Sequence, residues 1–263
     1  MNVPKIIDAH VHIFPPKVAI KATEATANYY GAQMHGNGTI ENLLSNGKKI
    51  NVYKYIVHST ATKVDQVESI NNFIADATAQ NECFIGFGTL HPDLKDVESE
   101  VNRIISLGLK GVKLHPDFQN FNIDDPSMMP IYKALEGRLP VLIHMGDEKR
   151  TSSSPERLSN VLNIFPKLSA IAAHLGGYQM WDDSIKYLVG KNLYLDTTSS
   201  LAFLDKEKAK YIIKEHGVEK ILFGSDYPMW SHEEELHRLC DLNLTDEELE
   251  LILWKNASKL LNM

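Results

Sequence analysis

Five histidines stand at or near the ends of apolar segments, where side chains that bind or react are often found. They are His10, His12, His115, His144 and His174, out of 11 histidines in 263 residues. Histidine is uncommon on apolar strands, so its repetition there calls for a chemical reason. The ring titrates near neutrality and its neutral form ligates transition metals, so this set indicates metal binding combined with proton transfer.

The tightest spacing is that of His10 and His12. Alternate residues of a strand point to one side, so both rings are expected there together with Asp8. His144 and Asp226 each follow an apolar segment. Three imidazoles and one carboxylate form a donor set suited to Zn²⁺, Mn²⁺, Fe²⁺ or Ni²⁺, and a hydrogen-bonded core or loop histidine is the alternative for each ring.

Further candidates are a base and an anion-binding group. His174 is expected either as another metal ligand or as the base beside a metal-bound water, with a core histidine as the alternative. Lys113 and His115 share one side of a strand, and a lysine directed into a pocket is costly unless it meets an anion. Substrate contact, a carbamylated bridge between two metals and a rim salt bridge all stay open for Lys113. Arg150 is expected either to bind a substrate carboxylate or to belong to a solvated charge run.

The remaining candidates rest on position alone. His58 and His91 end strands in ordinary turn contexts and are expected to be structural. Histidines expected in loops or on helix surfaces are His35, His216, His232 and His237. Residues predicted near a pocket are Gln119, Tyr178, Trp181, Asp196, Thr197, Ser199 and Trp230.

Eight short apolar segments recur along the chain and are predicted as strands. They span residues 5–13, 53–59, 83–90, 109–115, 140–145, 169–175, 192–197 and 220–225. Segments of helical periodicity lie between most of them, at 65–80, 95–107, 128–137, 155–165, 178–189 and 205–216. Alternating strands and helices predict an α/β fold with a parallel sheet, whose buried strands read as nearly continuous apolar runs.

A closed (β/α)8 TIM barrel fits this number of strands. All strands of such a barrel end on one face, so residues far apart in sequence meet at one mouth. The rival is an open doubly wound sheet, but no glycine-rich phosphate loop follows the first strand. No linker or shift of composition marks a boundary, so residues 1–263 are expected to form a single domain.

Two segments depart from the alternation. Residues 15–49 form a long insertion, expected either as a lid that shapes a pocket or as a plain surface insertion. Thr245 and Glu248 form a capping-box pattern at the start of a helical tail that runs to residue 261. This tail is expected on the outside or at the base of the barrel.

Composition narrows the partners. A formal charge of −7 disfavours nucleic acid and anionic membranes, and no apolar run is long enough to span a bilayer. Residues 1–14 lack a signal-peptide pattern, and Cys83 and Cys240 are interpreted as buried, reduced thiols. We therefore expect a cytoplasmic protein that acts on a small molecule, with a homodimer as the candidate assembly.

Several motifs, taken together and in order, resemble the amidohydrolase superfamily. They are DAHVH at 8–12, GVKLHP at 111–116, VLIHMG at 141–146, AHLGG at 173–177, FGSDYP at 223–228 and NA at 256–257. More narrowly, the chain resembles the amidohydrolase-related branch that contains aminocarboxymuconate semialdehyde decarboxylase, resorcylate decarboxylases and several lactone hydrolases. The resemblance covers essentially the whole chain.

This resemblance implies a distorted barrel that holds one divalent metal ion, with zinc as the expected ion and manganese or iron as alternatives. It places His174 beside the bound water and lets Asp226 serve as ligand and base by turns. Two-metal members carry a bridging carboxylated lysine or a glutamate near the position of Lys113, whereas the one-metal branch leaves this lysine to meet substrate. The ligands that the resemblance implies are His10, His12, His144 and Asp226.

The activity expected from this site is hydrolysis. A divalent ion lowers the pKa of bound water and polarises a carbonyl, so an amide, ester or lactone of a small anionic substrate is attacked with His174 or Asp226 as base. The alternative is nonoxidative decarboxylation of an aromatic or unsaturated carboxylic acid, and a length of 263 residues, short for such a decarboxylase, favours hydrolysis. A non-catalytic protein that keeps the metal site is the third reading.

Overall fold

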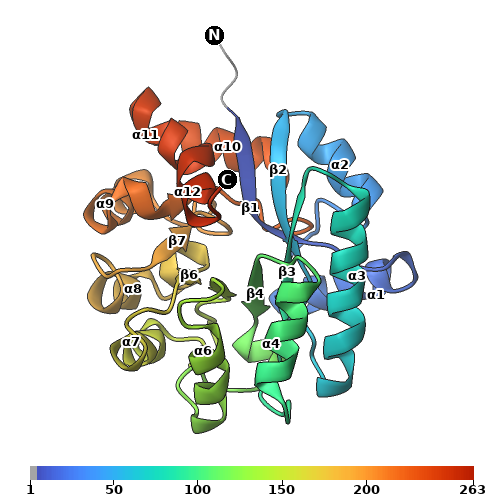
Figure 1. Ribbon diagram of the computed structural model, residues 1–263. Helices are drawn as coiled ribbons and strands as arrows, with labels where there is room; N and C mark the ends of the chain where they lie inside the picture. The colour runs from blue at the N-terminus through green and yellow to red at the C-terminus, as the bar shows by residue number, and fades with distance from the viewer. Residues whose placement is uncertain (1–4) are drawn as a thin grey trace.

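The computed structural model describes residues 5–263 and confirms the predicted (β/α)8 barrel (Figure 1). Eight strands pair in parallel and in chain order, and their ends agree with the predicted segments to within a few residues. Because the strands are parallel, all of their carboxyl ends lie on one face. The strands are β1 Ile6–His12, β2 Val52–His58, β3 Phe84–Thr89, β4 Gly111–Leu114, β5 Val141–Ile143, β6 Ala170–Ala172, β7 Tyr194–Asp196 and β8 Ile221–Leu222.

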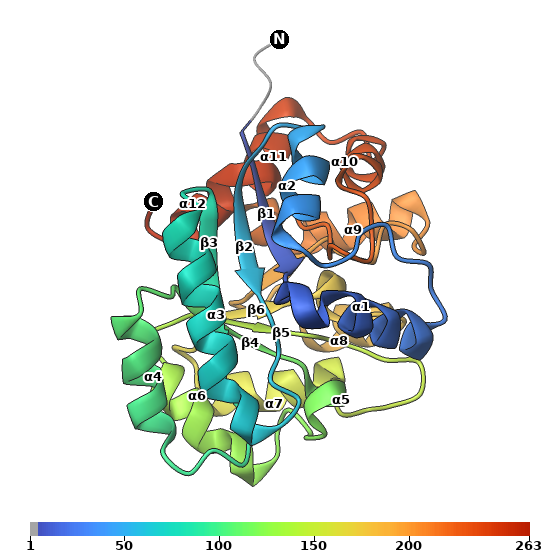
Figure 2. The ribbon, with the colours of Figure 1, turned by 90° about the vertical axis from the view of Figure 1, so that its right-hand side faces the viewer.

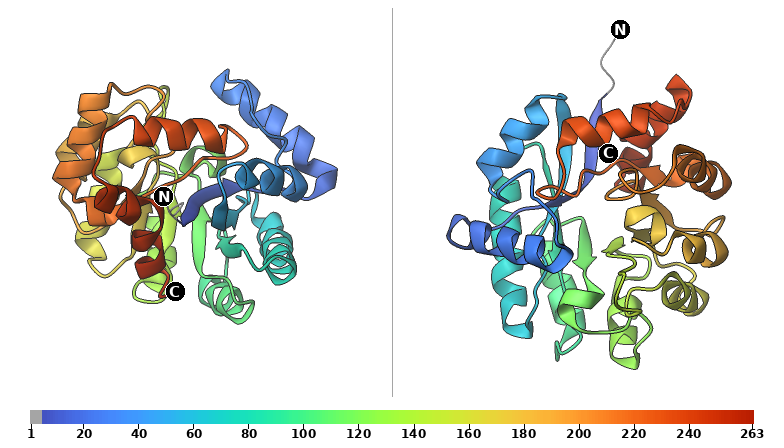
Figure 3. Two further views of the ribbon diagram at one scale, coloured as in Figure 1. Left: turned by 90° about the horizontal axis from the view of Figure 1, so that it is seen from above. Right: turned by 180° about the vertical axis from the view of Figure 1, so that it is seen from behind.

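Helices surround the strands as an outer ring, which is clear from behind (Figure 3, right). The main helices between strands are α3 Val67–Gln80, α4 Val97–Ser106, α6 Met129–Leu135, α7 Pro155–Ile164, α8 Trp181–Tyr187 and α9 Lys206–His216. Short helical turns are η1 Val64–Gln66, α5 Pro116–Gln119, η2 Pro126–Met128, η3 His174–Gly176 and η4 Val218–Lys220. After β8 come α10 His232–Cys240, α11 Asp246–Glu250, the π-helical turn η5 Leu251–Lys255 and α12 Asn256–Leu260.

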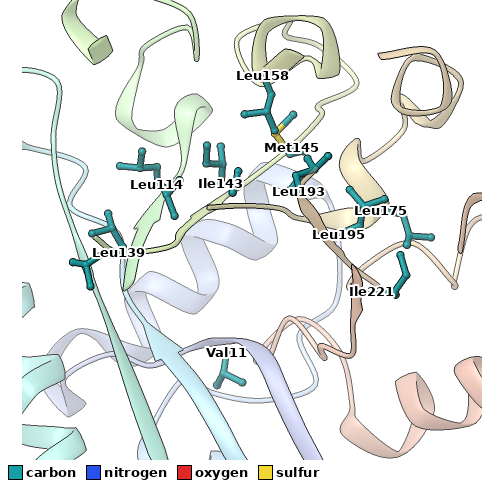
Figure 4. Packing of buried hydrophobic residues seen from close by; sticks show 14 of the residues in the cluster. Val11, Leu114, Leu139, Ile143, Met145, Leu158, Leu175, Leu193, Leu195 and Ile221 are labelled. Atoms are coloured by element: carbon teal, nitrogen blue, oxygen red, sulfur yellow. The ribbon is translucent and has the colours of Figure 1, made fainter. Parts of the chain in front are cut away.

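Two buried hydrophobic layers alternate along the strands. Ile7, Leu142 and Leu222 belong to a cluster that contains strand residues and the C-terminal segment, which places it inside the barrel. Their neighbours face the helices: Ile143 and Leu195 belong to the outer layer, and Figure 4 shows Met145 of the same layer beside Leu158 of α7. Ala257 of α12 joins the inner cluster, so the predicted helical tail closes the base of the barrel.

The first and last strands meet without a regular ladder. The loop after β8 runs along β1 instead, with the Asp226 N–H donating to the His10 carbonyl at 3.0 Å. The His12 N–H donates to the Tyr227 carbonyl at 2.8 Å. The loop that carries Asp226 therefore closes the barrel and brings this carboxyl beside the two histidines of β1.

The insertion at 15–49 contains two helices, α1 Pro16–Tyr30 and α2 Ile40–Lys48. Thr39 caps α2, because its hydroxyl accepts from the Asn42 N–H at 3.3 Å. Gly31 ends α1 in the left-handed conformation, with a φ of 62°. Helix α1 lies across the carboxyl end of the barrel and projects from its body (Figure 2).

Some expectations about individual side chains are wrong. Cys240 is exposed and Cys83 is only half-buried, because both lie toward the outer surface. His216 and His232 are buried rather than on helix surfaces. No helix of residues 5–263 is long and apolar enough to cross a membrane. Residues 1–4 lie outside the described residues. They belong to the expected single domain and to the N-terminal segment 1–14 that lacks a signal-peptide pattern.

Candidate active site

Three donor atoms converge at the carboxyl ends of β1 and β8. His10 Nε2 lies 3.3 Å from His12 Nε2, and Asp226 Oδ1 lies 3.5 and 3.4 Å from these two nitrogens. Donor atoms held about 2.1 Å from one ion in tetrahedral geometry stand about 3.4 Å apart. The three side chains therefore fit a single transition-metal ion as they stand.

The protonation of these groups suits the same purpose. Burial opposes ionisation of Asp226, but its electrostatic interaction with His10 and its hydrogen bond with His12 outweigh burial and hold the pKa of the carboxyl below its ordinary range. Burial lowers the pKa of His12 to about 4, so this ring is neutral near pH 7. Carboxylate and neutral imidazole are the forms that ligate metals.

A buried carboxylate at the end of β7 orients His10. Asp196 Oδ2 lies 2.9 Å from His10 Nδ1, and its Oδ1 accepts from the backbone N–H groups of His174 at 2.9 Å and Thr198 at 3.2 Å. The carboxylate holds a proton on Nδ1 and leaves the Nε2 lone pair for an ion, as outer partners of metal-bound histidines commonly do. From the sequence, Asp196 was only a pocket candidate. Its position at the end of a strand is nevertheless similar to that of His144, which directly follows a strand.

Lys113 of β4 reaches the same histidine from inside the barrel. Its Nζ lies 3.0 Å from His10 Nε2, and the side chain is fully buried. Burial lowers the pKa of Lys113 to about 8, because the apolar surroundings disfavour the charged form. The lysine thus lies behind His10 rather than on the wall of the cavity described below.

His144 and His174 face each other across the site. His174 Nε2 lies 2.9 Å from His144 Nδ1. His144 Nε2 lies 3.0 Å from the Gly146 carbonyl and His174 Nδ1 lies 3.1 Å from the Thr198 carbonyl, and a carbonyl accepts only, so both outer nitrogens carry protons. In the neutral rings both facing nitrogens are then lone pairs. Two lone pairs at this distance repel each other, and a further proton or a nearby cation would remove the repulsion.

Three loops hold site residues in the left-handed region. The φ angle is 62° at His174, 51° at Ser199 and 56° at Asp226. Residues other than glycine seldom adopt this conformation, and its strain concentrates at functional sites. Ser199 Oγ donates to Asp226 Oδ2 at 2.6 Å, and Trp230 Nε1 donates to Ser199 Oγ at 2.9 Å. These bonds fix the direction in which Asp226 presents its other oxygen.

A cavity of about 1090 Å³ opens over the site. His12, His144, His174 and Asp226 line its inner end, and the insertion that carries α1 lines its outer wall. The last turn of α1 is tied to the barrel, since Tyr29 donates to Asp147 Oδ2 at 2.9 Å. The structure thus places the insertion over the mouth of the barrel. This is the expected lid that shapes a pocket and not a plain surface insertion.

Of the remaining predicted site residues, His115 lies at the cavity and Arg150 does not. The His115 ring stacks between Phe118 and His144, with ring centres 3.9 Å from each. His115, Asp117 and His144 also bring donor atoms together, but the parallel rings do not direct their nitrogens at one point. Arg150 is exposed and donates to the Asp117 carbonyl at 3.1 Å.

The residues chosen by position divide into two groups. Tyr178, Ser199 and Trp230 line the cavity. Gln119 and Trp181 instead hold the backbone, because Gln119 Nε2 donates to the Leu90 carbonyl at 2.7 Å and Trp181 Nε1 to the His174 carbonyl at 3.0 Å. Thr197 accepts from the Gly224 N–H at 3.4 Å.

Sequence reasoning missed His58. Its ring centre lies 4.4 Å from that of His12 and 5.0 Å from that of His10, and its donor atoms group with theirs as a possible ligand set. Among the described residues neither of its buried ring nitrogens has a hydrogen-bond partner. The signal was available, since His58 ends an apolar strand just as His144 follows one.

Asp8 does not join the two histidines of β1 as expected. The pairing of β1 with β2 is irregular between Asp8 and Val11, so strict alternation fails there. Asp8 Oδ1 accepts from the Ser225 N–H at 3.0 Å, and Oδ2 lies 3.1 Å from His232 Nε2. The carboxylate therefore braces the loop before Asp226 from behind.

Comparison with known proteins identifies the family of this chain. The family model described as amidohydrolase matches residues 7–263. Among curated proteins the chain is similar to 2-amino-3-carboxymuconate-6-semialdehyde decarboxylase of Dictyostelium discoideum, at 24% identity over 212 residues that cover 63% of this chain. The match covers 57% of that relative, so the chain spans little more than half its length.

Solved structures share the fold over nearly the whole chain. The 5-carboxyvanillate decarboxylase of Sphingomonas paucimobilis has a TM-score of 0.77 at 16% identity, with 98% of this chain and 99% of that chain covered. The dihydroxybenzoic acid decarboxylase of Polaromonas sp. JS666, solved with manganese and the inhibitor 2-nitroresorcinol, has a TM-score of 0.77 at 16% identity, with 98% and 97% covered. At such identity the likeness shows the fold alone.

The expectation of carbonyl hydrolysis is wrong, because curated relatives that the chain matches are named as decarboxylases. The candidate metal site is common to both readings and survives the correction. From the barrel, the convergent donor atoms and the match over residues 7–263, the chain belongs to the amidohydrolase family of enzymes.

Proposed function

We propose that this protein is a metal-dependent, nonoxidative decarboxylase of an aromatic or unsaturated carboxylic acid. The observation that carries the proposal is the convergence of His10 Nε2, His12 Nε2 and Asp226 Oδ1 within 3.3–3.5 Å of one another at the floor of an aromatic-lined cavity. The decarboxylases to which the chain is similar, in sequence and in fold, support this choice of reaction.

The proposed metal site holds one divalent ion. His10, His12 and Asp226 would be its ligands, and His144, whose Nδ1 lies 2.9 Å from His174 Nε2, is the proposed fourth. A bound divalent ion supplies a positive charge that fixes the substrate oxygens and stabilises the electrons left when the C–C bond breaks. The sequence favoured zinc, whereas a solved neighbour holds manganese, so we propose manganese and zinc as the two ions to test.

His174 is the proposed proton carrier. Its Nδ1 proton is committed to the Thr198 carbonyl, so Nε2 is the atom free to accept and return a proton. Burial lowers the pKa of His174 to about 4, which makes its protonated form a strong acid once formed. In the proposed step His174 takes up a proton from solvent and delivers it to the carbon that loses CO₂, and the electrons of the broken C–C bond form the new C–H bond. Asp226 remains the alternative carrier.

The roles of Lys113, His115 and Arg150 in substrate binding stay predictions. Lys113 is close enough to His10 to hold its lone pair in the absence of an ion, at 3.0 Å from Nζ to Nε2. Measuring the number of metal ions per chain tests whether Lys113 is carbamylated, because a carbamylated lysine that bridges metals requires two ions per chain. A single domain, a cytoplasmic location and a homodimer are likewise proposed, and limited proteolysis, fractionation and light scattering test them.

The test starts with protein loaded with one equivalent of manganese or zinc and with hydroxybenzoates as substrates. We expect release of CO₂, loss of this activity in Asp226→Asn and His174→Asn, and about one ion per chain in the wild type. The matched control is Asp124→Asn, an aspartate whose partners Arg157 and Asn160 lie on the outer surface. Folded, metal-loaded protein that releases no CO₂ from any hydroxybenzoate or unsaturated acid would overturn the proposal.

A further inference from the structure

The cavity over the site is larger than one benzene ring requires. Its volume is about 1090 Å³, at the upper end of the roughly 300–1,000 Å³ of small-molecule pockets. Only a few of its lining residues belong to the candidate metal site, and residues of α1 line another part of it. The volume beyond the reacting groups therefore belongs to the part of the substrate that does not react.

One face of α1 forms the outer wall. Val18, Ala22, Ala25 and Tyr29 line the cavity, and their spacing of three and four residues places them in one stripe along the helix. The two alanines have the smallest side chains that a helix prefers, so the middle of this stripe leaves room. Larger side chains there would fill the space over the mouth.

The opposite wall is aromatic and fixed in position. Phe203 and Trp230 meet edge to face with ring centres 5.9 Å apart, and Phe203 meets Tyr178 in the same way at 5.5 Å. Trp230 is held by its hydrogen bond to Ser199 at 2.9 Å. Aromatic rings on this wall offer apolar surface on which a planar, apolar group can stack.

Positive charge is scarce along this extension. Of the described residues that line the cavity, Lys21 alone is a lysine or arginine, and it is exposed on α1. Asp117 and Glu148 line the same cavity and would repel an anion. Arg150, the expected carboxylate partner, is directed to the Asp117 carbonyl and does not line the wall. A second carboxylate on the substrate would find no buried cation here.

We infer that the substrate is a monocarboxylic acid whose carboxylate lies at the metal site and whose body extends beyond one ring as an uncharged, planar, apolar group between α1 and Trp230. This inference rests on the proposed decarboxylase function for the placement of the carboxylate. The shape of the extended part of the substrate is inferred from the residues that line the cavity, independently of the reaction. It identifies Ala25 as a specificity-determining position, because its methyl group faces the extended part of the cavity.

Binding of three acids to the metal-loaded protein tests the inference by titration calorimetry. The probes are 2-hydroxybenzoate, 1-hydroxy-2-naphthoate and 4-hydroxyisophthalate, which differ by a fused ring or by a second carboxylate. We expect the naphthoate to bind at least about tenfold more tightly than the benzoate, because the fused ring buries additional apolar area, and the isophthalate to bind more weakly.

The variant Ala25→Phe should remove the advantage of the naphthoate and leave benzoate binding within about twofold, which also shows that the variant is folded. Asn28→Phe places the same side chain on exposed helix away from the cavity and should change neither. Equal binding of the three acids, tightest binding of the isophthalate, no binding at all, or an Ala25→Phe protein that keeps the preference would each overturn the inference. CO₂ release is measured separately, so naphthoate preference without CO₂ sinks the proposed reaction and not the inferred shape.

Discussion

Replacing Asp196 with asparagine changes one atom in the support of the metal site. The oxygen Oδ1 of Asp196 accepts from the His174 and Thr198 N–H groups, whereas Oδ2 faces His10 Nδ1 at 2.9 Å. An asparagine keeps the two backbone bonds only when its carbonyl takes the Oδ1 position. Its NH₂ group then points at a nitrogen that already carries a proton.

The structure allows His10 one way to escape this clash of two donors. Its proton must move from Nδ1 to Nε2, which removes the lone pair that faces His12 and Asp226. Changes of such outer partners cost about 10–100-fold in metal affinity. That factor corresponds to about 1.4–2.7 kcal/mol, and we expect Asp196→Asn to weaken metal binding by this amount.

Competition against a chromophoric chelator measures the affinity of the wild type and of Asp196→Asn. Asp124→Asn serves as the control, because it makes the same chemical change far from His10. Circular dichroism establishes that each variant is folded before titration. A folded Asp196→Asn protein that binds the ion within about twofold of the wild type would refute the assigned role of this carboxylate.

Other predictions concern stability. Burial raises the pKa of Glu235 from 4.5 to about 8, with Arg238 opposing the shift, so the folded state holds this proton more tightly than the unfolded chain. The stability that this proton contributes is complete below about pH 4.5 and is lost as the pH rises toward 8, which amounts to about 2–3 kcal/mol between pH 5.5 and 7.5. In urea unfolding, Glu235→Gln should remove this loss of unfolding free energy. The same slope of unfolding free energy against pH in wild type and variant would contradict the prediction. His58→Leu should raise the melting temperature of the metal-free protein by several degrees, because it removes two unpaired buried nitrogens. A melting temperature below that of the wild type would show that the His58 ring makes hydrogen bonds. Gly146→Ala should destabilise the fold by about 1–3 kcal/mol in chemical denaturation, since φ is 80° and an added Cβ would lie 2.3 Å from the Tyr178 carbonyl oxygen; unchanged stability would contradict this close approach.

The fold was predictable because parallel strands that are buried on both faces keep their apolar character regardless of detail. The runs around Val141–Ile143 and Ile221–Leu222 are examples, and both stand in the barrel as expected. Helix α10 was not among the helical segments predicted with bounds, since His232 and three successive glutamates begin it and obscure its apolar side. Its buried His232 meets Asp8 across a contact of 3.1 Å that no local pattern reveals.

The site was harder to predict because its geometry depends on backbone irregularities. Asp8 lies on the same strand as His10, yet the irregular pairing between Asp8 and Val11 turns it away from the donor cluster. His58 was judged by the turn that follows it, whereas its surroundings are set by the β1 histidines. The reaction itself could not be chosen from the ligands, because the same donors serve hydrolysis and decarboxylation.

The seam between β1 and β8 links metal binding to the order in which the chain is completed. His10 and His12 come near the start of the described chain and Asp226 more than two hundred residues later, yet they lie 3.5 and 3.4 Å apart across a junction that lacks a strand ladder. A ribosome-bound fragment that ends before β8 has two of these donors and no third. We expect an ion that binds all three to hold this junction together and to stabilise the closed form by mass action. If the proposed ligands hold the ion, we expect the nascent chain to take it up only after β8 has reached β1.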